Sequence, residues 1–354
     1  MNNKKKCNFA IFKFNDKQMN KVSLKPHNTF GIDVWAEEFV FIRQDADLMD
    51  FLLSEKVRKP FLILGDGANV LFTKDFEGTV LKMETKEIEV VSEDENQVVV
   101  RAKAGENWDD FVRYSLSKGY FGLENLALIP GKVGSSPIQN IGAYGKEVKD
   151  FITKVHALSV KDASVRTFSN AECAFGYRSS IFKNALKGQY IITDVEFTLS
   201  KKANLNINYA DLKQQLGSDA VLSPQAVYDA VVAVRNAKLP DYKTVGNAGS
   251  FFKNPLVSTT YLDKLKQKYP NLTSYPVSNN TVKLAAGQLI DLLGWKGKRI
   301  GDAGVHSQQA LVLVNYGNAT GLEIFHLAQE IQKDVYAHFG IDLEMEVCIW
   351  SGES

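Results

Sequence analysis

Cysteine is scarce in this chain, and long apolar runs are missing from it. The three cysteines, Cys7, Cys173 and Cys348, are odd in number and widely spaced among 354 residues. This pattern argues against a disulfide framework or a zinc site and fits a reducing compartment. The five histidines show no HxxxH or HExxH spacing, so we expect no metal. No apolar run approaches the length that a membrane-spanning helix needs.

The chain also lacks an excess of charge of one sign. Its net charge of +1 favours neither nucleic acid nor a membrane surface as a partner. Residues 1–20 form a polar, basic extension without the apolar segment of a secretory signal, so we expect a cytoplasmic protein. Within this extension, Met19 is a hypothetical second start. The remaining length and a hydrophobic content of 45% are enough for about two or three domains.

Periodicity predicts alternating helices and strands. Apolar spacing in "DADLMDFLLSEKV" indicates a helix capped by Asp45, and "PFLIL" after it indicates a buried strand that runs into glycines. Such a unit favours a ligand loop at the strand's carboxyl end. Further on we expect hairpins in 88–105 and 155–168, a helix in 106–118, a strand in 190–200, and helices beginning at Ser223 and near Gly321. No internal repeat is evident.

Two glycine-containing stretches stand out. In "LGDGAN", Gly65 and Gly67 permit close backbone approach, and consecutive amides can form an anion-binding nest. The stretch is not the dinucleotide fingerprint, because Val70 stands where the third glycine would be. On its own it is more typical of a structural turn.

The second stretch, "IPGKVGSSPIQNIGAYG" at 129–145, holds four glycines and two prolines, too many breakers for a helix or strand. Its amides can face an anion, its prolines restrict the loop before a ligand arrives, and Gln139 and Asn140 can both donate and accept hydrogen bonds. We therefore interpret it as a binding surface for a phosphate-bearing cofactor. The alternative is an irregular surface connection, although long structureless loops inside domains are usually functional.

This second stretch closely resembles the hallmark of the UDP-N-acetylenolpyruvoylglucosamine reductase family. Other motifs occur in the family's order: "NTFGID", "LGDGANVL", "FGYRSSIFK", "NAGSFFKNP", "KLAAGQLID", "VHSQQALVLVN" and "LEMEV". The resemblance covers roughly Leu24 to Trp350. It implies an α+β chain with an FAD-binding fold of the vanillyl-alcohol-oxidase/p-cresol-methylhydroxylase type in two lobes, plus a smaller α+β substrate-binding domain.

From these motifs we expect five segments. They are the extension 1–20, an FAD-binding lobe 21–90, a second FAD-binding lobe 91–239, a substrate-binding domain 240–345, and a tail 346–354 that returns to the active site. The chain is expected to be a monomer.

The resemblance also implies a reaction. Non-covalently bound FAD takes hydride from NADPH, which then leaves, and the nucleotide-sugar substrate enters the same site. Hydride goes to the vinyl carbon of the enolpyruvyl ether, giving UDP-N-acetylmuramate for peptidoglycan. The enediolate that forms needs a positive clamp and a proton donor. This order predicts ping-pong kinetics.

By matching motifs, the resemblance assigns the site residues. Arg178 and Glu346 stabilise the enediolate, the acid being protonated or sharing a proton through burial beside another carboxylate, and Ser250 donates the proton. The cofactor residues are Gly65, Gly67, Ala68, Asn69, Pro130, Gly131, Gly134, Ser135, Gln139, Asn140, Gly142, Ala143 and Tyr144. The substrate residues are Tyr177, Tyr209 (the lid tyrosine of one branch of the family), Lys238, Asn254, Lys296 and Gln309.

Taken alone, these residue types have ordinary structural explanations. Arg178 would be a surface ion pair, Glu346 an exposed acid, and Ser250 a polar turn residue; Tyr209 would be a core residue at a strand end. The sequence departs from the family at Cys348, where arginine is usual, which weakens any role assigned to that position but not the role of Glu346.

Two rival functions follow from the same features. A flavin oxidase acting on an alcohol or aldonolactone with oxygen would share the fold, but it would be favoured by a histidine for covalent flavin attachment in the glycine-rich loop, and none is present. A non-catalytic flavin or nucleotide-sugar binding protein would be favoured by loss of Arg178, Ser250 or Glu346, and all three are present.

Overall fold

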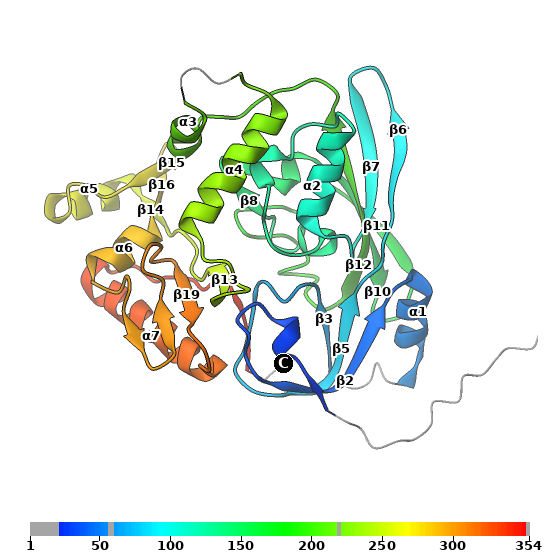
Figure 1. Ribbon diagram of the computed structural model, residues 1–354, viewed down its shortest axis with the longest axis horizontal. Coiled ribbons are helices and arrows are strands. Elements are labelled where there is room, and N and C mark those ends of the chain that lie inside the picture. The colour runs from blue at the N-terminus through cyan, green and yellow to red at the C-terminus, as the bar shows by residue number, and fades with distance from the viewer. Residues whose placement is uncertain (1–20, 56–59, 218–220, 352–354) are drawn as a thin grey trace, which may run out of the picture.

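The computed structural model describes residues 21–55, 60–217 and 221–351. The expected extension 1–20, with Met19, lies outside these residues. The helices are α1 (Asp45–Leu53), α2 (Trp108–Ser117), α3 (Ala210–Leu216), α4 (Pro224–Lys238), α5 (Thr259–Lys268), α6 (Ala286–Leu292) and α7 (Gly321–Phe339). Figure 1 shows the C-terminal helices and strands beside the N-terminal two-thirds of the chain.

The N-terminal lobe is built on a four-stranded sheet in the order β1-β2-β5-β3, in which β2, β5 and β3 are parallel. Its strands are β1 (Val22–Ser23), β2 (Trp35–Ile42), β5 (Phe76–Met83) and β3 (Phe61–Leu64). The expected helix is α1, which buries Leu48, Phe51 and Leu52 against this sheet. The expected cap at Asp45 is wrong, because Gln44 occupies the N-cap and the carboxylate of Asp47 accepts the N–H groups that precede the helix.

The second lobe is a five-stranded antiparallel sheet in the order β11-β10-β12-β7-β6, with α2 packed on it through Trp108 and Phe111 (Figure 1). Helix α4 packs against α3 and residues 124–126. Its strands are β6 (Ile88–Glu93), β7 (Gln97–Lys103), β10 (Ile152–Ser159), β11 (Val165–Ser169) and β12 (Tyr190–Ser200). Both expected hairpins are present as β6–β7 and β10–β11. Helix α4 begins as expected, since the Ser223 hydroxyl accepts the Ala226 N–H at 3.1 Å.

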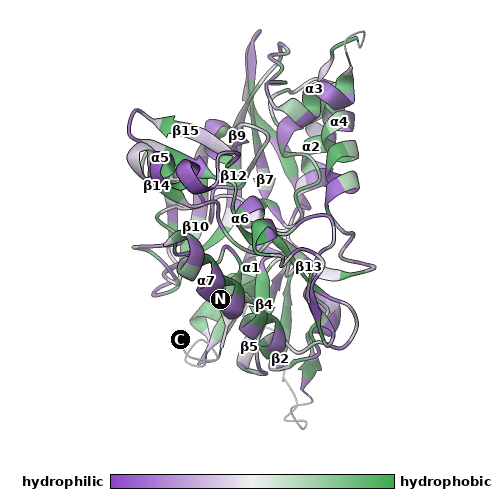
Figure 2. Cartoon of the chain, turned by 90° about the vertical axis from the view of Figure 1, so that its left-hand side faces the viewer, coloured by the Kyte–Doolittle hydropathy of each residue, from purple (hydrophilic) through white to green (hydrophobic). Residues whose placement is uncertain are grey.

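The C-terminal part contains two small antiparallel sheets, in the orders β13-β19-β18-β17 and β14-β16-β15. Its strands are β13 (Gly246–Ser250), β14 (Leu256–Ser258), β15 (Ser274–Ser278), β16 (Thr281–Leu284), β17 (Arg299–Ile300), β18 (Ala303–Val305) and β19 (Val312–Asn315). Helix α7 buries the expected apolar face. In Figure 2 both α7 and α4 carry hydrophobic and hydrophilic residues, as amphipathic surface helices do.

After α7 the chain crosses back to the N-terminal lobe. Strand β20 (Cys348–Trp350) pairs in parallel with β4 (Val70–Phe72). Because β4 follows "LGDGAN" directly, this pairing places Glu346, two residues before β20, beside that loop. The last strand therefore joins sequence-distant parts of the expected site.

Candidate active site

The glycine-rich loop 129–145 is a built structure rather than an irregular surface connection. The Asn140 side chain holds it together: Nδ2 donates to Glu147 Oε2 and to Gly176 O, both at 2.9 Å, and Oδ1 accepts the Lys149 N–H at 3.1 Å. Asn140 is fully buried. Its side-chain amide is thus engaged by protein, its N–H donates to Pro137 O at 3.4 Å, and its carbonyl accepts from Arg178 Nη1 at 3.5 Å.

Several glycines are required by close contacts within the protein itself. A Cβ on Gly67 would lie 2.1 Å from His27 O, and a Cβ on Gly134 would lie 2.5 Å from Ala104 Cβ. At Gly142 a Cβ would come within 3.2 Å of Arg178 Nη1. These glycines bring the loops against their neighbours, including one candidate catalytic side chain. Their contact with a cofactor stays a prediction.

The side chain of Arg178 is held by two segments of the chain at once. Its Nη2 donates to Gly142 O at 2.8 Å, and its Nε lies 2.8 Å from Glu346 Oε1 as an ion pair without the alignment of a hydrogen bond. The side chains retain only 19% and 13% of their exposure. The backbone of Arg178 has φ +52°, a left-handed conformation that costs energy in a non-glycine residue and persists only where surroundings enforce it.

Ser250 and Glu346 are brought together by main-chain pairing. The Glu346 N–H donates to the carbonyl of Phe251, the residue after Ser250, at 2.8 Å. Asn69 Nδ2 reaches across to Glu346 O at 3.3 Å and to Gln139 Oε1 at 2.8 Å. Ser250 is exposed, and its hydroxyl has no hydrogen-bond partner among the described residues. Both glycine-containing loops, Arg178, Glu346 and the backbone next to Ser250 thus meet in one place, a group of candidate residues that we name the catalytic cluster.

The "LGDGAN" loop carries free backbone donors. In the part of the chain that the structure describes, the N–H groups of residues 66–69 donate to no protein acceptor. Lys132 Nζ lies 3.2 Å from Asp66 Oδ1, and Lys82 Nζ lies 3.8 Å from the same oxygen. Burial lowers the pKa of Lys82. The charge of Asp66 raises this pKa and the charge of Lys132 lowers it, and the net shift is downward. Unpaired consecutive amides beside two lysines suit a diphosphate.

Two further groups near the cofactor loops were missed by the sequence analysis. The Ser136 hydroxyl and the Arg235 Nε are buried without a partner among the described residues. Burial lowers the pKa of Arg235, with the phenol of Tyr144 nearby acting in the opposite direction. Ser136 lies inside the glycine-rich stretch but was not among the predicted cofactor residues. Arg235 lies on α4, for which the sequence analysis considered only the apolar residues. Unsatisfied buried donors of this kind fit a bound cofactor such as FAD.

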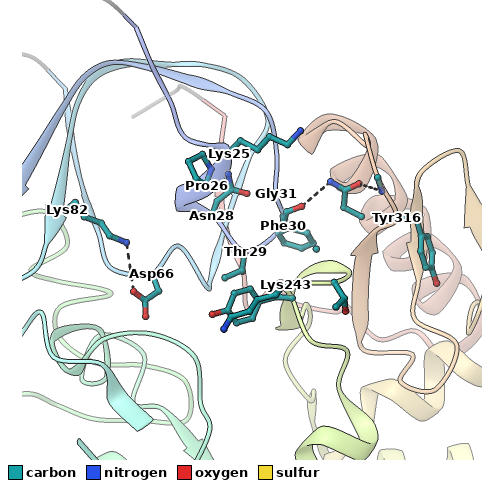
Figure 3. A pocket seen from close by; sticks show the side chains of 15 residues that line it. Lys25, Pro26, Asn28, Thr29, Phe30, Gly31, Asp66, Lys82, Lys243 and Tyr316 are labelled. Carbon is teal, nitrogen blue, oxygen red and sulfur yellow. Dashed lines mark hydrogen bonds and ion pairs between the residues drawn. The ribbon is translucent and has the colours of Figure 1, made fainter. Parts of the chain in front are cut away.

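A polar cavity of about 480 Å³ adjoins the first loop (Figure 3). Asp66 and Lys82 lie on one side of it, and Lys243 and Tyr316 belong to the C-terminal part on the other. A second cavity of about 700 Å³ is bordered by Tyr177 and by the segment 253–258. The first cavity therefore borders the "LGDGAN" loop at Asp66, and the second borders Tyr177, the residue before Arg178.

The candidate substrate residues fall into two groups. Tyr177 and Asn254 border the second cavity, and Asn254 Oδ1 also accepts the Ala286 N–H at 2.9 Å. Tyr209 is not at a strand end as expected but at the N-cap of α3, where its ring lies 5.7 Å from that of Tyr144 and 6.4 Å from that of Tyr275. It therefore lies between the second lobe and the C-terminal part.

The other three substrate candidates have partners within the protein. Lys238 forms an ion pair with Asp211, and the exposed Lys296 forms one with Asp291. Gln309 Oε1 accepts the Leu311 N–H at 3.4 Å. The remaining cofactor candidates belong to the two glycine-containing loops and are Gly65, Ala68, Pro130, Gly131, Ser135 and Ala143. Cys348 is exposed on β20.

Two absences concern the described residues only. No helix among them is both long and apolar enough to cross a bilayer. No group of three or more histidine, cysteine, aspartate or glutamate side chains is placed there to hold a metal ion.

Comparison with known proteins gives a consistent result. Residues 39–169 match the FAD binding domain family, and residues 240–350 match the C-terminal domain of UDP-N-acetylenolpyruvoylglucosamine reductase. Reductases of that name from Flavobacterium johnsoniae and Bdellovibrio bacteriovorus are 47% and 45% identical to this chain. The alignments cover 92% and 94% of this chain and 97% and 99% of those proteins.

A solved structure gives the fold. The UDP-N-acetylenolpyruvylglucosamine reductase of Thermus caldophilus superposes with a TM-score of 0.63 at 22% identity, over 94% of this chain and 99% of that one. The expected α+β architecture with an FAD-binding fold of the vanillyl-alcohol-oxidase type is confirmed. On the strength of the sequence identities, the chain belongs to the UDP-N-acetylenolpyruvoylglucosamine reductase family.

Proposed function

We propose that this protein is an FAD-dependent oxidoreductase that uses NADPH to reduce the enolpyruvyl ether of UDP-N-acetylglucosamine-enolpyruvate to UDP-N-acetylmuramate, a peptidoglycan precursor. The observation that carries the proposal is the contact of Arg178 with Glu346 beside Ser250, at the edge of the glycine-rich loop, in a chain of this family. We further propose that the protein acts as a cytoplasmic monomer on a nucleotide sugar.

The chain's own residues fit the cofactor. The amides of residues 66–69 and of the glycine-rich loop would hold the diphosphate without covalent attachment, while Ser136 and Arg235 would gain the partners they lack. When bound, FAD supplies hydride chemistry, accepting hydride from NADPH and giving it to the enolpyruvyl group. The protein's part is to position that group and to stabilise the charge that develops on it.

Arg178 is the positive clamp in this proposal. Its guanidinium is already oriented by Gly142 O and Glu346, so little reorganisation is needed when a substrate carboxylate arrives. A guanidinium can hold that carboxylate through two parallel hydrogen bonds. Since charge grows on the carboxylate as hydride reaches the vinyl carbon, this contact strengthens toward the transition state.

Glu346 and Ser250 handle the proton. The sequence analysis expected a second carboxylate beside Glu346. In the structure the side chain that faces Glu346 is the cation Arg178. When the substrate carboxylate shares the clamp, Glu346 meets a like charge, which favours its taking a proton and donating a hydrogen bond. The unpaired hydroxyl of Ser250 then gives its proton to the carbon beside the carboxylate, and Ser250 regains one from solvent.

Steady-state kinetics test this function. NADPH oxidation should require the enolpyruvyl nucleotide sugar, and double-reciprocal plots at several fixed sugar concentrations should be parallel, as expected when both ligands use one site in turn. Intersecting lines would indicate a ternary complex and contradict the shared site. NADPH oxidation that needs only oxygen would favour the oxidase instead.

A further inference from the structure

Ser180 is a fully buried serine to which the proposed function gives no role. It stands two residues after Arg178, and its Oγ donates to Ile138 O at 2.6 Å. Ile138 belongs to the glycine-rich loop 129–145, so the bond joins that loop to the segment that carries the clamp. The two residues are 42 positions apart, so the bond fixes tertiary structure rather than a local turn.

Arg178 occupies a tight turn. The Gly176 N–H donates to Ser179 O at 3.0 Å, and the Ser179 N–H donates to Gly176 O at 3.2 Å, which leaves Tyr177 and Arg178 between the paired residues. In this turn Arg178 has φ +52°, a conformation that a non-glycine residue adopts at a cost in energy. Contacts outside the turn must therefore hold it.

Two side-chain hydrogen bonds attach this turn to the glycine-rich loop, one on each side of Arg178. Before Arg178, the Asn140 Nδ2 donates to Gly176 O at 2.9 Å. After Arg178, the Ser180 Oγ donates to Ile138 O. Both donor residues are fully buried, and a hydrogen bond removed from water is electrostatically stronger than one in solvent.

The direction of the guanidinium depends on the distance that these bonds set between turn and loop. Arg178 Nη2 donates to Gly142 O at 2.8 Å, while Nε faces Glu346. A shift of the turn away from the loop would lengthen the contact with Gly142 O. The remaining N–H groups of the guanidinium would then point in another direction.

We infer that Ser180 is a positioning residue for substrate reduction: its bond to the glycine-rich loop fixes the turn that aims Arg178 at the substrate carboxylate. The inference rests on the proposed function. Asn140 shares this task but is also an expected cofactor residue, so Ser180 gives the cleaner test. NADPH has no enolpyruvyl carboxylate for the clamp to hold, so loss of the bond should slow only one half of the reaction.

The test is Ser180→Ala in the purified holoenzyme, with each half of the reaction followed by stopped-flow absorbance. We expect substrate reduction to be slowed about 10- to 100-fold, as for a small displacement of a positioned group, and flavin reduction by NADPH to be unchanged. The same change is then combined with Arg178→Lys. Because Ser180 acts through Arg178, it should add less than about threefold to the loss that Arg178→Lys causes alone.

The matched control is Ser115→Ala, since Ser115 is also fully buried and its hydroxyl also donates to a carbonyl, that of Phe111 at 2.9 Å. It should lower the thermal midpoint but leave both half-reactions unchanged. If Ser180→Ala does not fold, Ser180→Cys takes its place in the same comparison, because a thiol is only a weak donor.

A loss of less than threefold in Ser180→Ala would overturn the inference, as would equal slowing of both half-reactions. A further tenfold loss on top of Arg178→Lys would overturn it too, because Ser180 would then act independently of the clamp. Turnover of NADPH with the enolpyruvyl sugar by the unmodified protein is measured first. Its absence removes the proposed function, whereas turnover that Ser180→Ala leaves unaffected removes this inference alone.

Discussion

Arg178 and Glu346 form an ion pair, with Nε 2.8 Å from Oε1, that joins the second lobe to the segment before the last strand. The contact exists because β20 pairs with β4 and returns the end of the chain to the N-terminal lobe. From sequence alone, Arg178 and Glu346 could each be an ordinary surface residue. The structure holds them together beside both glycine-containing loops. The ion pair is the geometric basis of the proposed clamp.

Replacing Arg178 with lysine tests the clamp. Lysine keeps the charge but cannot contact Gly142 O and Glu346 while offering a planar fork to a carboxylate. We expect the rate of substrate reduction to fall about 100- to 1,000-fold, as for loss of a preorganised donor to a developing anion. The measurement is single-turnover re-oxidation of the reduced enzyme by the nucleotide sugar. A fall of less than threefold would remove Arg178 from this role.

Replacing Ser250 with alanine separates the two halves of the reaction. The Ser250 hydroxyl is exposed and has no partner among the described residues, so the change should leave folding and FAD content intact. Stopped-flow absorbance should show flavin reduction by NADPH nearly unchanged and substrate reduction slowed about 100-fold or more. Ser117→Ala, on the exposed face of α2, serves as the control. Equal slowing of both halves would exclude Ser250 as the proton donor.

Gly142→Ala tests the close approach of the loop to the clamp. The added methyl carbon would lie 2.9 Å from Lys146 O and 3.2 Å from Arg178 Nη1, so the loop or the guanidinium must move. A shift of this size in a positioned group costs about 100-fold in rate. The comparison is with Gly188→Ala, where no atom lies within 4 Å of the added carbon and φ is +73°, so that any loss there comes from backbone strain alone. If both variants retain full substrate reduction, the loop does not position Arg178.

The long C-terminal helix α7 provides a stability test. The Thr320 hydroxyl accepts the Glu323 N–H at 3.2 Å, and the Glu323 carboxylate accepts the Thr320 N–H at 2.7 Å, forming a capping box. Thr320→Ala should lower the free energy of unfolding by about 1 kcal/mol. Urea unfolding followed by tryptophan fluorescence measures this. An unchanged midpoint would mean that the cap adds nothing to the packing of α7.

The sequence predicted helices and strands correctly where the chemistry of neighbouring residues determines them. Helix α4 begins where serine precedes proline, and its valines follow the helical period. The first helix shows the limit of such signals: Gln44, Asp45 and Asp47 all compete for one cap, and only the three-dimensional path of the chain selects Gln44. The glycines of both loops were found by their composition, but the reason for them, contact with His27 O or Ala104, depends on the fold.

The site itself was found through motifs rather than through periodicity. No local pattern pairs Arg178 with Glu346, because their contact depends on the pairing of β20 with β4, which are far apart in the sequence. Ser180 belongs to one of the recognised motifs, yet its hydrogen bond to Ile138 O appears only in three dimensions. The same holds for the buried Nε of Arg235. Domain boundaries and the roles of individual residues remain predictions.

The central claim is a two-step hydride transfer through one site, and the flavin spectrum measures it most directly. The purified protein is kept free of oxygen, NADPH is added in one equivalent, and the enolpyruvyl nucleotide sugar follows. We predict that NADPH bleaches the visible absorbance of the flavin by reducing it, and that the sugar alone restores that absorbance. A spectrum that stays bleached after the sugar is added would contradict the account.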